Sequence, residues 1–146
     1  MLTGEGMQDA RCRMQDEDDM TEGPSGYHKL EVFNLAKTLA VEIHKATLED
    51  LPKFEMFEQG SQVRRSSKSI VAGLVEGFGR RAYKADFVRY ITYAIASCDE
   101  TKAHLDLLFE TGSLTEAKYS QLKNSYEALG AKLYAFRQAV LAHHAS

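Results

Sequence analysis

The amino-acid sequence predicts an all-α protein, an antiparallel up-down-up-down four-helix bundle. Two observations carry this prediction. Apolar residues return every three or four positions through four long segments, which is the period of one face of an α-helix. Only two prolines occur among 146 residues, whereas a β-rich chain of this size would need many more turn signals. Hydrophobic residues make up 44% and charged residues 27%, as is typical of one globular domain.

The N-terminal segment differs in composition from the rest of the chain. Residues 1–26 hold seven acidic and two basic side chains, a net charge of −5. Residues 27–146 carry 16 bases and 14 acids, a net charge of +2. Few large apolar side chains lie in the first segment to offset the entropy of ordering it. We therefore expect residues 1–26 to form a disordered acidic tail and residues 27–146 to form the bundle domain.

Several features favour a cytoplasmic location without membrane contact. No window of 18 consecutive apolar residues is present, and the N-terminus lacks the basic and apolar regions of a signal peptide. Cys12 lies in the acidic segment and Cys98 in a periodic apolar one, so a disulfide between them is not expected. Two free thiols suit a reducing compartment.

The first two helices are predicted on either side of a connector that contains Pro52. The first runs from about Lys29 to Thr47. Its apolar face is Val32, Leu35, Ala36, Leu39, Ala40 and Ile43. The second runs from about Ser61 to Arg80 and is rich in small residues. Gly73 within it costs roughly 1 kcal/mol relative to alanine, which suggests a close helix neighbour at that point.

The last two helices have the clearest periodicity. One is predicted from about Lys84 to Thr111 and the other from about Leu114 to Ala142. Seven-residue spacing relates Phe87, Ala94, Thr101 and Leu108, with Ile91, Cys98 and Leu105 between them. Gly112 is the expected left-handed helix stop, and Ser113 with Glu116 has the spacing of a capping box. So short a link makes the last helix run back antiparallel.

Basic residues concentrate between residues 62 and 89, where the local net charge is +5. The candidate nucleic-acid-binding residues are Arg64, Arg65, Lys68, Arg80, Arg81, Lys84 and Arg89. Tyrosines in the same segment could stack on unpaired bases while the cations attract phosphates. A solvated face with ion pairs between subunits explains the same pattern, and the low overall charge favours this alternative.

Catalytic and metal sites are not expected. Glu76 and Glu100 lie beside the predicted seams, where each could pair with an arginine in a partly buried site. A third polar group that would complete an acid–base site is missing. Metal binding in such bundles uses Glu-x-x-His pairs, which do not occur here; Glu100 and His104 are four apart, and only once. We therefore predict a protein that is not an enzyme and has no cofactor or metal.

Aromatic residues are too numerous for one thin seam. Phe33, Tyr93 and Tyr134 fall outside the heptad positions. Aromatic side chains on a second face suggest a subunit interface, so we expect a homo-oligomer. The alternative is a broad core with partly exposed tyrosines.

Three sequence blocks resemble a known bacterial family. The first is Tyr27-His28-Lys29-Leu30-Glu31-Val32-Phe33. The second is Gln62-Val63-Arg64-Arg65-Ser66-Ser67-Lys68-Ser69-Ile70, continued by Val75-Glu76-Gly77-Phe78-Gly79-Arg80. The third is Phe87-Val88-Arg89-Tyr90 with Ala96-Ser97 and Glu100. Together they are similar to the four-helix-bundle proteins first described as encoded within the intervening sequence of 23S ribosomal RNA genes. The likeness covers about residues 27–142, although Gly73, Val75 and Ala96 replace the usual asparagine, alanine and glycine.

The resemblance implies a non-enzymatic bundle that assembles into a ring, expected to be a pentamer. It also implies a distant likeness to the accessory variability protein of diversity-generating retroelements, which binds reverse transcriptase and nucleic acid. Arg64, Arg65, Glu76 and Glu100 match the family's polar positions, which implies an inter-helix ion network. Our leading hypothesis is an oligomeric scaffold that contacts RNA or DNA. The alternative is a retroelement accessory protein that binds a reverse transcriptase.

Overall fold

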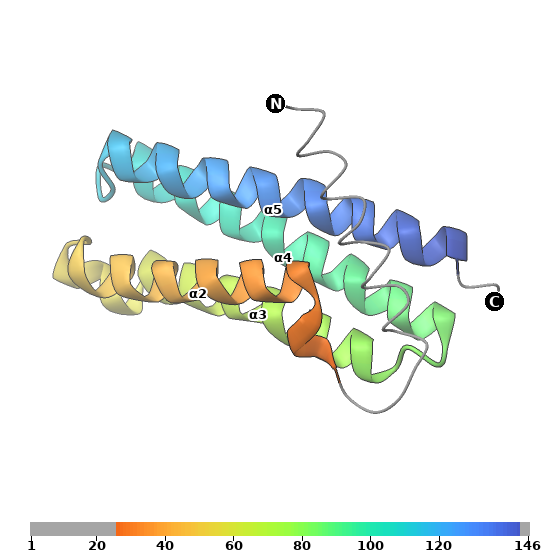
Figure 1. Ribbon diagram of the computed structural model, residues 1–146. Helices are drawn as coiled ribbons and strands as arrows, with labels where there is room; N and C mark the ends of the chain where they lie inside the picture. The colour runs from red at the N-terminus through yellow and green to blue at the C-terminus, as the bar shows by residue number, and fades with distance from the viewer. Residues whose placement is uncertain (1–25, 144–146) are drawn as a thin grey trace.

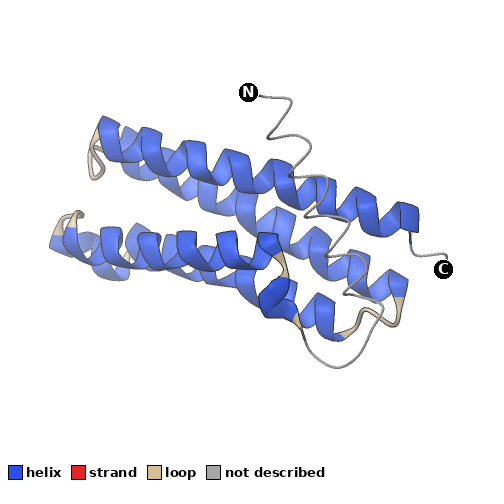
Figure 2. Cartoon of the chain, viewed as in Figure 1, coloured by secondary structure: helices blue, strands red, loops and turns tan. Residues whose placement is uncertain are grey.

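Four long helices account for most of residues 26–143, the part of the chain that the computed structural model describes (Figure 1). They are α2 (Glu31–Glu49), α3 (Gln59–Gly79), α4 (Lys84–Glu110) and α5 (Glu116–His143). Two short 3-10 helices, η1 (Tyr27–Lys29) and η2 (Lys53–Phe57), precede α2 and α3. No strand occurs in this described part (Figure 2), which confirms the all-α prediction.

The helices alternate in direction along the chain. The α2–α3 and α4–α5 connections lie at one end of the molecule and the α3–α4 connection at the other (Figure 1). Each helix packs against the next in sequence, and α5 also packs against α2. The predicted up-down-up-down bundle is therefore confirmed, whereas the ring assembly stays a prediction.

The described residues begin at Gly26, the last residue of the predicted tail. Gly26 is buried, and its carbonyl accepts a 2.9 Å hydrogen bond from the Lys29 backbone N–H at the start of η1. The predicted disordered tail otherwise lies outside the described residues, as do residues 144–146. Each of the four long helices begins and ends within two residues of its predicted limits.

The predicted heptad positions of α4 all lie in the core of the bundle. All seven members of the α4 series are at most 1% exposed: Phe87, Ile91, Ala94, Cys98, Thr101, Leu105 and Leu108. Thr101 meets Ser66 of α3 through a 2.8 Å side-chain hydrogen bond, so this polar pair is satisfied inside the core. Burial of the apolar side chains that face the centre of the bundle stabilises the packing of the four helices.

Two glycines explain how α3, α4 and α5 are joined and packed. A Cβ atom at Gly73 would lie 3.3 Å from the Tyr90 carbonyl oxygen and 3.5 Å from Ala94 Cβ, both on α4. The predicted close helix neighbour at Gly73 is thus confirmed. Gly112 has a φ of 79°, the left-handed conformation expected of a helix stop.

The predicted capping box is wrong. α5 begins at Glu116, and Thr115 caps it by accepting a 3.3 Å hydrogen bond from the Lys118 N–H. Ser113 instead lies buried and donates a 2.7 Å hydrogen bond to Oε2 of Glu55, itself only 5% exposed. Ser113 therefore bonds to a carboxylate that is distant in sequence rather than to the first turn of α5. Local sequence rules such as the capping box do not include such a partner.

The aromatic prediction is corrected in part. Phe33 is only 6% exposed and packs edge-on against Tyr27, with ring centroids 4.9 Å apart, so it belongs to the core. Tyr93 and Tyr134 are each 52% exposed, as expected for aromatic residues outside the seam.

Candidate nucleic-acid interface

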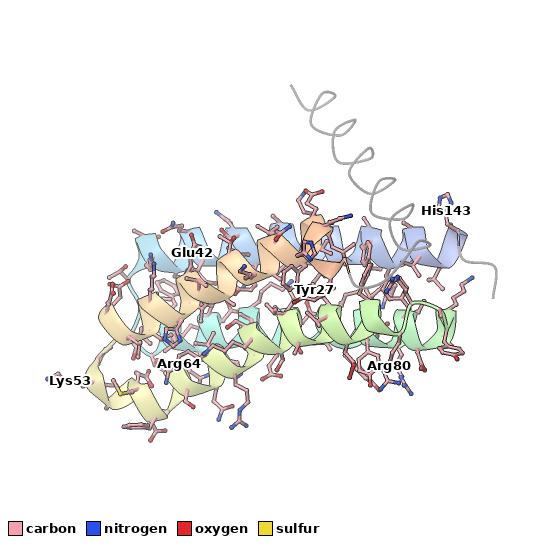
Figure 3. All side chains as sticks on the ribbon, turned by 60° about the horizontal axis from the view of Figure 1, so that its bottom comes forward. Tyr27, Glu42, Lys53, Arg64, Arg80 and His143 are labelled. Carbon is pink, nitrogen blue, oxygen red and sulfur yellow. The ribbon has the colours of Figure 1, made fainter. Side chains whose placement is uncertain are left out.

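The predicted basic segment divides into two groups at opposite ends of α3. Arg64, Arg65 and Lys68 lie in its first half, whereas the other four candidates surround the α3–α4 connection. Twelve residues separate Lys68 from Arg80, which is roughly 18 Å along a helix. Figure 3 labels Arg64 and Arg80 well apart along the molecule. The two groups therefore do not form one continuous surface.

Arg64 is directed into the protein. Its Nη2 atom donates a hydrogen bond to the carbonyl oxygen of Met56 in η2. Its Nη1 atom is buried and has no hydrogen-bond partner in the structure. The guanidinium thus ties η2 to α3, and it is poorly placed to contact an external phosphate.

Arg65 and Lys68 face outward next to Arg64. Arg65 is exposed, and so is Lys68, whose Nζ lies 3.3 Å from Nδ1 of His44 on α2. Lys68 therefore lies where α3 meets α2 at the surface of the bundle.

Four residues at the α3–α4 end form what we call the corner surface: Arg80, Arg89, Tyr90 and Tyr93. The guanidinium carbons of Arg80 and Arg89 each lie 5.3 Å from the centre of the Tyr90 ring. Tyr93 meets Tyr90 edge-on, with ring centroids 5.4 Å apart. Side-chain exposure is 45% for Arg80 and 51% for Arg89, so both cations reach solvent.

Acidic side chains partly neutralise the corner surface. Asp86 lies 3.6 Å from Arg80 and 3.1 Å from Arg89, between the two arginines. Glu76 pairs with Arg80 at 3.7 Å. A guanidinium has five N–H donors, so each arginine keeps donors free for a phosphate. These pairs are exposed, and each contributes only about 0–1 kcal/mol to stability.

Arg81 and Lys84 are held by backbone carbonyl groups. Arg81 Nη1 donates a 3.0 Å hydrogen bond to Phe78 O, and its guanidinium lies 4.2 Å from the centre of the Phe78 ring. Lys84 Nζ donates a 3.0 Å hydrogen bond to the Leu141 carbonyl near the end of α5. Lys84 thus ties the start of α4 to the end of α5, whereas Arg81 contacts the last turn of α3. Both contribute less to the free surface than Arg80 and Arg89.

Arg64, Arg65, Glu76 and Glu100 do not come together within one chain. Glu76 of α3 pairs with Arg80, the residue that directly follows this helix, and Glu100 pairs with His104 at 3.1 Å within α4. The side chains of both glutamates are about half exposed, at 53% and 54%, rather than partly buried as expected. An ion network between subunits stays a prediction.

Sequence reasoning missed Arg137 of α5 as a neighbour of this surface. Arg137 lies 5.1 Å from the centre of the Tyr134 ring, and its Nη1 donates a 3.2 Å hydrogen bond to Thr92 Oγ1. Thr92 follows Arg89 by three residues, so the two share a face of α4. The available signal was the spacing of three between Tyr134 and Arg137, which places the two side chains on one face of α5.

Three further properties of the described residues concern metal ions, the Cys98 thiol and membranes. Within residues 26–143, no group of three or more His, Cys, Asp or Glu side chains could hold a metal ion. Burial raises the pKa of the Cys98 thiol to about 11, so it stays protonated at neutral pH. No helix in the described range is both long and apolar enough to cross a membrane.

These observations define an all-α bundle that presents an arginine–tyrosine surface at one end. A family model described as 23S rRNA-intervening sequence protein matches residues 28–135. The chain therefore belongs to the family of 23S rRNA-intervening sequence proteins, as the sequence blocks indicated.

One solved structure supports the fold. It is a protein of unknown function from the S23 ribosomal protein family of Bacteroides thetaiotaomicron, with 24% sequence identity and a TM-score of 0.65. The match covers 73% of this chain and 95% of that one. None of the curated proteins matches the chain.

Proposed function

We propose that this protein is a non-enzymatic, oligomeric scaffold that binds single-stranded regions of RNA through the corner surface. The observation that carries the proposal is the pair of guanidiniums 5.3 Å from the Tyr90 ring, with Tyr93 exposed beside it. The exposed arginines supply phosphate contacts, and the tyrosines supply flat surfaces for unpaired bases.

The charge of the chain sets the expected strength of binding. A formal net charge of −3 gives no general attraction for nucleic acid, so the contact depends on the local cations. Asp86 lowers the local positive potential further. We therefore expect weak binding that falls steeply with salt, with each phosphate contact on a single strand adding about 0.7 to the slope.

Self-association is supported by apolar side chains that remain exposed in one chain. The most exposed are Phe54 at 67%, Phe57 at 86% and Tyr83 at 71%. Exposed aromatic side chains are typical of subunit interfaces. Phe54 and Phe57 lie in η2, at the opposite end of α3 from the corner surface. An interface there would leave the corner surface accessible to RNA.

The test is a salt titration of binding to a single-stranded oligoribonucleotide. Arg80→Ala/Arg89→Ala should reduce the slope of log affinity against log salt by about 1.4, since two phosphate contacts are lost. Arg65→Ala/Lys68→Ala removes the same charge from the other group, and it should leave the slope near that of the wild type.

Two outcomes would overturn the proposal. Absence of binding by the wild type at low salt would exclude a nucleic-acid role. An equal loss of slope in both double variants would show that only total charge matters, not the corner surface. The native mass of the particle tests the scaffold: we expect an oligomer, and a monomer at micromolar concentration would refute that part.

A further inference from the structure

A groove of about 470 Å³ runs between α2 and α3, away from the corner surface. Its floor is formed by alanine and valine side chains, including Val41 and Val71. Its rim carries four basic groups: Lys37, His44, Lys45 and Lys68. No acidic residue lines it, which is unusual in a chain with more acidic than basic residues.

The basic rim lacks charge partners within the described residues. Lys37, Lys45 and Lys68 take part in no ion pair there, and the only polar contact of Lys68 is with His44. Val41 on the floor is 46% exposed. A ligand that suits this groove combines several negative charges with apolar side chains or chain segments.

The chain contains such a segment immediately before the bundle. Residues 1–25 hold seven carboxylates against two arginines, and four of the carboxylates are consecutive, at residues 16–19. The same segment contains Leu2, Met7, Met14 and Met20, which could cover the apolar floor.

The segment is tethered close to the groove. It ends at Gly26, and only η1 separates it from α2, the helix that forms one wall. Lys37 and Lys45 lie about 9 and 21 Å along α2 from its first residue, at 1.5 Å per residue. The carboxylates of residues 16–19 lie seven to ten positions before Gly26, and this stretch can extend over roughly 23–33 Å. A tether of this length gives effective concentrations in the millimolar range, so even weak ion pairs are populated.

We propose that the acidic segment of residues 1–25 binds in the α2–α3 groove of its own chain, with the carboxylates of residues 16–19 against Lys37, Lys45 and Lys68. The contact is electrostatic at the rim and apolar at the floor. It does not depend on RNA binding at the corner surface, which lies on other residues.

Zero-length carbodiimide cross-linking of the full chain at low salt, mapped by mass spectrometry, tests this contact. We expect cross-links from residues 16–19 to Lys37, Lys45 or Lys68. The yield at Lys68, whose amine is kept, should fall about fivefold in Lys37→Glu/Lys45→Glu, as expected for the loss of two exposed ion pairs. It should also fall at high salt.

The matched control is Lys53→Glu/Lys118→Glu, which changes the charge equally at lysines outside the groove. It should leave the yield unchanged. Lys132 and Glu31, 3.0 Å apart, provide an internal reference cross-link that should persist in every variant. Circular dichroism verifies that each variant keeps its helices.

Two results would overturn the proposal. Cross-links from residues 16–19 that reach Lys53 and Lys118 as often as the groove lysines would show no preferred site. In an equal mixture of ¹⁵N-labelled and unlabelled protein, unfolded and refolded together, products that join the two isotopes in about half of the cross-links would place the segment on another copy.

Discussion

Arg64 lies near the start of α3 and Arg80 directly follows its end, and their surroundings give them opposite roles. Arg64 donates a hydrogen bond to the Met56 carbonyl and has a buried Nη1 atom. Arg80 is 45% exposed, pairs with Asp86 and Glu76, and lies against an aromatic ring. Basic residues that are clustered in the sequence can therefore have different roles. At one end of α3 an arginine makes internal hydrogen bonds, and at the other end an arginine remains accessible to solvent.

The largest expected effect is on stability at the Arg64 end. Arg64→Ala should lower the free energy of unfolding by about 1–3 kcal/mol, because the half-buried Met56 carbonyl loses its charged donor. Arg65→Ala, at the exposed neighbouring position, should change it by less than about 0.5 kcal/mol. Urea denaturation measures both values, and equal effects would contradict the inward role of Arg64.

The next largest expected effect is on RNA affinity, from the exposed ring of Tyr93 in the corner surface. Tyr93→Leu should weaken binding of a single-stranded oligoribonucleotide by about 1 kcal/mol, or roughly fivefold, because one stacking surface is lost. Phe54→Leu removes an exposed ring at the opposite end of α3, and RNA affinity should be unchanged. Fluorescence anisotropy separates the two, and a larger loss from Phe54→Leu would place the RNA elsewhere.

A gain of affinity is expected when Asp86 is neutralised. Asp86→Asn should tighten RNA binding by a few-fold, about 0.5–1 kcal/mol, since both arginines are released from an exposed carboxylate. Asp99→Asn makes the same charge change farther along α4, where Asp99 lies 3.2 Å from Lys102. If both variants gain affinity equally, general repulsion rather than the corner surface explains the effect.

The smallest expected effect concerns Asp106, in neither group. Hydrogen bonds from Lys123 and Tyr119 lower the pKa of the Asp106 carboxyl below its ordinary value of 3.8. A lowered folded-state pKa adds stability above the unfolded value, and that stability is lost as pH falls below about 4. Asp106→Asn should cost under about 1 kcal/mol at pH 7, because the pair is partly exposed.

The pH profile provides the check for Asp106. The difference in unfolding free energy between the wild type and Asp106→Asn should shrink as pH falls from 6 to about 3. A difference that stays constant across this range would contradict the proposed ion pair.

The helices were predictable because their pattern is local and repeated. Seven-residue spacing in α4 placed Phe87, Cys98 and Leu105 in the core, and Gly73 indicated the close approach of a neighbour. Periodicity gives the direction of a side chain relative to its own helix axis. Burial of the predicted seams follows from that direction.

The candidate site was less predictable because it depends on contacts distant in sequence. Ser113 has the spacing of a cap but bonds to Glu55, which is 58 positions away. Arg64 follows the same basic pattern as Arg65, and only the position of η2 turns its guanidinium inward. Arg137 joins the corner through Thr92 on another helix, 45 positions away.

The most direct test of the account is ultraviolet cross-linking of an oligouridine to the full chain, with mass-spectrometric mapping of the modified residues. Tyr83, Tyr90 and Tyr93 surround the α3–α4 connection, whereas Phe54 and Phe57 are exposed at the other end. We predict nucleotide adducts on the tyrosines. Adducts on Phe54 or Phe57, with none on the three tyrosines, would contradict the assignment of the corner surface.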